Sequence, residues 1–171
     1  QTAIGSVVAS DAEGADLTFT LSGDDAASFS ISSAGVLSFA AAPNFEVKST
    51  YSVTVTVSDG TSSNSSDFAI TVSNFNEAPI ITSAHSLSIV ENLAAVLTLT
   101  SSDPESDSLT YALSGDDAAL FSVNAATASL SFKSAPDFET PGDTDGDNRY
   151  VVTVTATDVG GASATQDLTI T

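Results

Sequence analysis

Cysteine, tryptophan and methionine are all absent from this chain of 171 residues. Without cysteine, no disulfide framework can hold the fold together, and a thiol nucleophile is excluded. If the protein is extracellular, it needs another cross-link in place of disulfides, and a bound metal ion is the usual substitute.

Cations are almost as scarce, because only Lys48, Lys133 and Arg149 stand against 22 acidic residues. The formal net charge is −19, so no basic patch can form to bind nucleic acid or anionic lipid. Without counterions, charge repulsion of this size would loosen the fold.

Long apolar runs are also missing, since none approaches the ~18 residues that a membrane span needs. The chain has a single histidine, His85, which we interpret as a surface or packing residue, and it has no glycine-rich phosphate loop. We therefore predict no enzyme and no membrane insertion. No signal peptide is present, and we expect a fragment of a longer secreted or cell-surface protein.

An internal repeat organises the sequence. The segment 21–27 (LSGDDAA) returns 92 residues later at 113–119, and 42–46 (APNFE) returns 93 residues later as APDFE. The segment 57–59 returns only after 99 residues, which places an insertion at 140–148. The repeat is domain-sized, so we predict two domains, residues 1–76, lacking a first strand, and 77–171.

Alternation of apolar and polar residues predicts strands and no long helix. The clearest examples are 17–21, 51–57, 68–72, 96–99, 109–113 and 151–155. Single helical turns are expected at 24–28 and 116–120, where the paired aspartates are interpreted as caps rather than as acid–base catalysts. We predict an all-β fold of two tandem, seven-stranded Greek-key β-sandwiches of Ig-like type. Its core is expected to include Phe19, Phe39, Phe45, Phe68, Phe132 and Phe138.

Acidic and amide side chains gather where the two copies meet. The junction reads Asn74-Phe75-Asn76-Glu77-Ala78-Pro79, and Val90-Glu91-Asn92 begins eleven residues after Pro79. Sites made only of oxygen suit a hard cation such as calcium, which takes about six to eight oxygen ligands. The alternative is that these are ordinary solvated loop charges.

These motifs resemble those of cadherin repeats, particularly the cadherin-like repeats of large bacterial surface proteins. Glu91-Asn92 is similar to the first motif, 44–46 and 137–139 to the second, and 74–77 to the linker. Asp103-Pro104-Glu105 and 11–13 resemble the fourth motif, and Asp158 and Asp59 the fifth.

The resemblance implies three sets of calcium ligands. The junction would use Asn44, Glu46, Asn74, Asn76, Glu77, Asp103, Glu105 and Asp158. A downstream half-site would use Glu91, Asp137, Glu139, Asp143, Asp145 and Asp147, and an upstream half-site Asp11, Glu13 and Asp59. Asn44, Asn74 and Ala78 depart from the family pattern, so fewer or weaker ions are expected than at a full linker.

The insertion carries a sequence similar to the start of an EF-hand loop. Its glycine, Gly146, comes too early, and Val154 stands where the bidentate glutamate would be, so an EF-hand is excluded. The insertion either adds calcium ligands or is a plain solvated loop.

The leading functional hypothesis is a calcium-rigidified extracellular segment that extends or joins an adhesive protein, with adjacent repeats as partners. The alternative is a module that binds polysaccharide or another cadherin-like domain. The absence of tryptophan weakens the polysaccharide alternative, whereas exposed aromatic residues would favour it.

Overall fold

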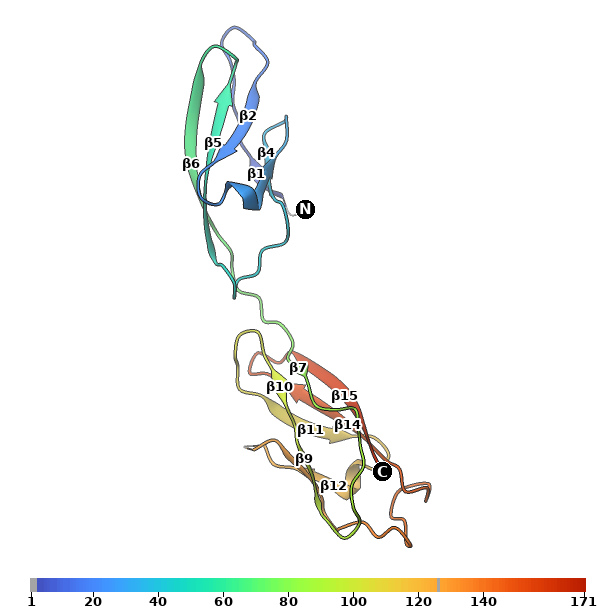
Figure 1. Ribbon diagram of the computed structural model, residues 1–171. Helices are drawn as coiled ribbons and strands as arrows, with labels where there is room; N and C mark the ends of the chain where they lie inside the picture. Colours follow the sequence, from blue (N-terminus) through green and yellow to red (C-terminus); the bar gives the residue numbers. More distant parts are fainter. Residues whose placement is uncertain (1–2, 126) are drawn as a thin grey trace. The chain divides into compact units, whose positions relative to one another are not determined.

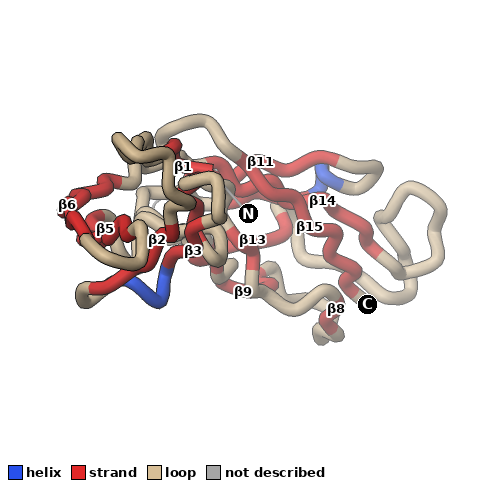
Figure 2. Tube along the Cα trace, turned by 90° about the horizontal axis from the view of Figure 1, so that it is seen from above, coloured by secondary structure: helices blue, strands red, loops and turns tan. Residues whose placement is uncertain are grey.

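The computed structural model describes residues 3–125 and 127–171. The chain divides into two compact units, one ending at Phe75 and the other beginning at Asn76. Strands dominate both units (Figure 2). Within the described residues, helix is confined to the single 3₁₀ turns η1 (Ala26–Ser28) and η2 (Ala118–Leu120). The predicted all-β class is confirmed.

The first unit contains two antiparallel sheets. One has the order β2-β5-β6 (Figure 1). The other has the order β1-β4-β3. Their bounds are β1 Ala3–Ser6, β2 Thr18–Ser22, β3 Phe29–Ile31, β4 Val36–Phe39, β5 Thr50–Ser58 and β6 Ser63–Thr71.

The second unit repeats this topology and adds strands to it. Its larger sheet has the order β11-β14-β15-β8, the next β12-β13-β9, and β10 pairs with β7. The bounds are β7 Ile80–Ile81, β8 Ser86–Leu87, β9 Ala95–Thr98, β10 Ser101–Ser102, β11 Thr110–Ser114, β12 Phe121–Val123, β13 Ser129–Phe132, β14 Tyr150–Thr157 and β15 Ser163–Ile170. β9 and β11 to β15 correspond to β1 to β6. In the described part of the first unit, β7, β8 and β10 have no counterpart.

The alternation read from the sequence places every second residue in the core. Along β14, the side chains of Val152, Val154 and Ala156 are fully buried, as expected for a strand with one face on the core. Phe121, Phe132 and Tyr150 pack beside them, with ring centroids 4.2 Å apart for the two phenylalanines and 4.9 Å apart for Phe132 and Tyr150. Phe29, Phe39 and Tyr51 form the same group in the first unit.

Two of the predicted core phenylalanines are not in the core. Phe39 and Phe132 are buried, but the side chain of Phe45 is 38% exposed and that of Phe138 is 65% exposed. The prediction for Phe45 and Phe138 is wrong because both lie in loops after β4 and β13, where the two-residue period of a strand no longer fixes the direction of a side chain.

The predicted caps are also wrong. Asp25 and Asp117 occupy the N-cap positions of η1 and η2, but neither carboxylate bonds to its own turn. Backbone carbonyls already accept the N–H groups of these short turns. For example, the N–H of Leu120 donates to the backbone carbonyl of Asp117. The carboxylates instead accept the N–H of Ser52 (2.8 Å) and Val151 (2.8 Å) at the start of β5 and β14.

Candidate metal centre

Three segments of the second unit meet beside its first residues. Asn76 and Glu77 precede β7, the loop after β10 carries Asp103 and Glu105, and Asp158 follows β14. The Asn76 amide donates a hydrogen bond to Asp158 Oδ2 at 2.9 Å. A carboxylate oxygen of Glu77 lies within 4.8 Å of one of Glu105. Asp103, Glu105 and Asp158 all lie near enough to Asp107 for their charges to act on it, so the structure brings together the five predicted junction ligands that belong to this unit.

Each aspartate of this cluster uses one oxygen to hold its own loop. Asp103 Oδ1 accepts the N–H of Asp107 at 3.0 Å, and Asp158 Oδ1 accepts the N–H of Ala162 at 2.9 Å. The second oxygen of Asp103 is therefore held in a fixed direction and is available for another partner, whereas Asp158 Oδ2 accepts the Asn76 amide.

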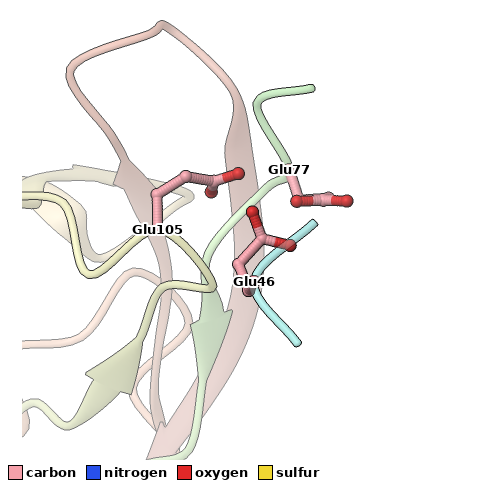
Figure 3. Close-up of side chains that lie close together, drawn as sticks. All are labelled: Glu46, Glu77 and Glu105. Carbon is pink, nitrogen blue, oxygen red and sulfur yellow. The ribbon is translucent and has the colours of Figure 1, made fainter. Parts of the chain in front are cut away.

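Several carboxylate oxygens here are buried without a hydrogen-bond donor. Among the described residues they include Asp103 Oδ2 and both oxygens of Glu105. Figure 3 shows the Glu105 side chain extending from its loop towards the segment that carries Glu77; Glu46, also drawn there, belongs to the first unit. A buried carboxylate that lacks a donor is costly unless a cation compensates for the lost water. The arrangement fits a hard divalent ion.

Asp107 is a member of this cluster that sequence reasoning missed. Burial raises the pKa of Asp107, and the nearby carboxylates of Asp103, Asp158 and Glu105 raise it further. The sequence does carry a signal for Asp107, because acidic residues alternate at positions 103, 105 and 107. The motif considered in the sequence analysis included only Asp103 and Glu105. The same carboxylates thus have two effects: they leave buried oxygens without donors, and their negative charge raises the pKa of Asp107.

Gly160 shapes the position of Asn76. A Cβ atom added at Gly160 would lie 2.4 Å from Asn76 Oδ1, so the amide rests where only glycine leaves room. Gly160 therefore supports the hydrogen bond between Asn76 and Asp158 without contributing an atom to it.

The remaining predicted junction ligands lie in the first unit. Asn44 Oδ1 accepts the N–H of Val47 at 2.8 Å and so closes the turn after β4. Glu46 and Asn74 are exposed in the same unit.

The predicted downstream half-site forms two separate groups. Carboxylate oxygens of Glu91, Asp137 and Glu139 lie within 4.8 Å of one another, as do those of Asp143, Asp145 and Asp147. Glu91 Oε2 accepts the N–H of Phe138 at 2.9 Å.

Within the second of these groups, Asp143 is mostly buried. Burial works to raise the pKa of Asp143, but backbone hydrogen bonds from Asp147 and Asn148 and the bond with Asp145 outweigh burial and lower it. The pKa of Asp145 is raised by its hydrogen bond with Asp143, by burial and by the charge of Asp147.

The upstream set repeats the loop geometry of Asp103 and Asp158. Asp11 Oδ1 accepts the N–H groups of Glu13 (3.0 Å) and Ala15 (2.8 Å), and Asp59 Oδ1 accepts those of Thr61 (2.7 Å) and Ser62 (2.6 Å). Asp11 and Asp59 line one hollow, but in the described residues no group of three close carboxylates forms there.

Comparison with solved structures shows the class of fold. The chain is similar to human protocadherin-24 EC1-2 (form II), with 23% identity, a TM-score of 0.65, and coverage of 98% of this chain and 86% of that one. Drosophila N-cadherin EC1-4 matches at 22% identity and a TM-score of 0.62, covering 99% of this chain and 44% of that one. Mouse cadherin-23 EC22-24 matches at 23% identity and a TM-score of 0.60, covering 91% and 52%. The predicted β-sandwich of cadherin type is confirmed.

The family is shown by sequence. The family model of the bacterial Ig domain matches residues 1–73 and again 76–171, so the chain belongs to this family. The expected resemblance to cadherin-like repeats of bacterial proteins is confirmed with it. No curated protein matches the chain. In the described residues, no helix is both long and apolar enough to cross a membrane.

Proposed function

We propose that the chain is a calcium-rigidified extracellular segment, built of tandem repeats, that extends or joins an adhesive cell-surface protein. Its repeats would be residues 1–76 and 77–171, with adjacent repeats of the same protein as partners. The family and the cadherin-like fold support an extracellular extender or adhesion module. They also support a structural rather than an enzymatic role.

The observation that carries the calcium proposal is the set of buried carboxylate oxygens without donors at Asp103 and Glu105. Asp103, Glu105, Asp158 and Glu77 would hold the ion, with Asp107 adding negative charge beside them. A bound calcium ion would neutralise this charge and cross-link the segment before β7 to the loops after β10 and β14. The linker would then be fixed to the body of the second unit.

Titration calorimetry tests the site directly. The wild-type chain should bind calcium, and Asp103→Ala should lose at least one ion because it removes an oxygen from the centre of the cluster. Asp116→Ala, which removes the same charge from an exposed position, should leave the number of bound ions unchanged. Absence of calcium binding by the wild-type chain, after removal of chelator, would end the proposal.

A matched pair of glycine variants tests the geometry of the same site. Gly160→Ala should displace Asn76 and weaken calcium binding about tenfold, a usual loss when an outer support of a metal site is removed. Gly5→Ala, at a position with no atom within 4 Å of the added Cβ, should leave the affinity unchanged.

One observation favours binding as a second candidate function. Phe138 is exposed and lines a hollow of about 260 Å³ together with Ile89, Pro136 and Tyr150. An exposed aromatic ring beside a hollow suits a polysaccharide or a partner domain. If this candidate is right, Phe138→Ala should abolish retention on the immobilised ligand, measured by affinity electrophoresis against a panel of polysaccharides. Calcium binding should not change in this variant.

A further inference from the structure

We propose that the second unit selects polysaccharides that carry carboxylate groups (polyuronates), and that Lys133 and Arg149 bind these groups. The inference rests on the second candidate function, polysaccharide binding beside Phe138, and names the class of sugar that this surface takes. It does not depend on the calcium proposal.

The two cations of the second unit line two adjacent hollows. Lys133 lines a hollow of about 290 Å³ whose walls include η2 and the insertion. Arg149 lines the hollow of about 260 Å³ that Phe138 borders. Pro136 and Tyr150 belong to the walls of both, so the hollows lie next to each other. Because the chain has only three cations, two of them at one place mark it as a setting for negative charge.

Neither of these cations is neutralised within the protein. In residues 3–125 and 127–171, the only ion pair joins Lys48 to Asp25 in the first unit. Lys133 Nζ donates one hydrogen bond, to the carbonyl of Ala119 at 2.7 Å, and keeps two further donors. The guanidinium of Arg149 makes no hydrogen bond in the same residues, because only its backbone N–H is bonded. Both side chains are exposed, so an anionic ligand can reach them.

Comparison of the two copies shows that these features occur together. Lys133 stands where the first copy has Ala40, and their N–H groups donate to corresponding carbonyls of η2 and η1 at 2.8 and 2.9 Å. Arg149 stands where the first copy has Thr50, because the offset is 99 residues after the insertion. Thr140 of the insertion forms part of the wall around Lys133. Both cations and this wall are departures of the second copy from the first, and they converge on one surface.

The other groups at this surface favour a sugar over an acidic peptide. The carboxylates of Glu91 and Asp147 line the hollow beside Arg149. One oxygen of each already accepts a backbone N–H, from Phe138 at 2.9 Å and from Arg149 at 2.8 Å, so the other oxygens can accept hydroxyl groups. A uronate residue offers a carboxylate to the cations, hydroxyl donors to these oxygens and an apolar face to the exposed ring of Phe138. An acidic peptide offers only the carboxylate.

The size of the hollows limits the fit to single sugar residues. Both volumes lie just below the range of about 300–1,000 Å³ that is typical of pockets for drug-sized ligands, so each hollow holds about one ring. Two residues of one polysaccharide chain can then place one carboxylate at Lys133 and another at Arg149. Binding should therefore depend on both cations.

Titration calorimetry of the full chain tests the assignment with defined oligosaccharides. The buffer contains chelator, so that calcium cannot bridge a uronate to the acidic protein. A hexamer of galacturonate or of mannuronate should bind saturably, whereas maltohexaose, a neutral hexamer, should bind at least about tenfold more weakly. A peptide of six glutamates carries the same charge without hydroxyl groups and should bind no better than maltohexaose.

Charge variants assign the effect to the two cations. Lys133→Gln and Arg149→Gln should each weaken hexauronate binding about tenfold, as expected for the loss of one charge-assisted hydrogen bond. Lys133→Arg keeps the cation and should retain binding. Lys48→Gln removes the same charge from the first unit and should leave binding unchanged. Because Lys133 and Arg149 are exposed, their variants should unfold at the wild-type temperature.

The outcomes separate this inference from the function on which it rests. Equal binding of maltohexaose and the hexauronates, or no loss in Lys133→Gln and Arg149→Gln, would overturn the carboxylate assignment and leave polysaccharide binding in place. Equal binding of the glutamate peptide would overturn it in favour of an acidic protein partner. Hexauronate binding that appears only after calcium is added would overturn it in favour of a calcium bridge. Binding of no saccharide, with or without calcium, would overturn both the inference and polysaccharide binding.

Discussion

Calcium at a hundredfold excess over its Kd should raise the free energy of unfolding of the second unit by about 2.7 kcal/mol relative to chelator. The reason is that the cluster of Asp103, Glu105 and Asp158 exists only in the folded unit, so the ion binds the native state alone. For a domain of this size, the unfolding temperature should rise by about 10–20 °C. Differential scanning calorimetry measures the shift.

Hydrogen exchange assigns this effect to a place in the chain. The amides of Asp107 and Ala162, which already bond to Asp103 and Asp158, should become more protected with calcium. Asp103→Ala serves as the control and should reduce the thermal shift. Identical melting curves in calcium and in chelator would contradict the calcium proposal.

Asp117→Ala should destabilise the second unit by roughly 3 kcal/mol, because it leaves buried N–H groups without an acceptor. The Asp117 carboxylate is 4% exposed and accepts the N–H of Thr144 (2.9 Å), the hydroxyl of Thr144 (2.9 Å) and the N–H of Val151 (2.8 Å). These bonds connect η2 to the insertion and to the start of β14. Chemical denaturation, fitted to separate transitions for the two units, measures the loss.

The first unit offers a matched control at Asp25. This residue holds the corresponding N–H of Ser52, and it also pairs with Lys48 at the surface. Hydrogen bonds from Lys48 and from Ser52 lower the pKa of Asp25. Asp25→Ala should therefore destabilise the first unit less than Asp117→Ala destabilises the second. A larger loss at Asp25 would show that burial does not set the size of the effect.

Much of the fold could be predicted because its main signals are local. The two-residue alternation of β5 and β14 identifies strands with one buried face, and Val152 and Val154 are buried as that pattern requires. The repeat of the segment 21–27 locates the same turn in both units. The roles of Asp25 and Asp117 could not be predicted, because their partners are 27 and 34 residues further along the chain.

The candidate site was predictable in chemistry but not in detail. Oxygen ligands and their order along the chain are visible in the sequence, and Asn76, Glu77, Asp103, Glu105 and Asp158 meet in the structure. The part played by Asp107 depends on how the loop after β10 turns, and Gly160 matters only because Asn76 lies against it. The exposure of Phe138 depends on a loop whose direction the strand period does not determine.

The pairing of β8 with β15 determines how the second unit responds to tension. The two strands run parallel, and the bonds between them include those from the N–H of Ile89 to Thr171 (2.8 Å), from Thr171 to Leu87 (2.9 Å) and from Thr169 to His85 (2.9 Å). The chain enters this pair through β8 and leaves it through β15, so a pull along the polypeptide slides the strands past each other. The pull then acts on all of their hydrogen bonds at the same time, so these bonds must break together. Bonds loaded one at a time would break one after another. In the described residues, no strand of the first unit corresponds to β8.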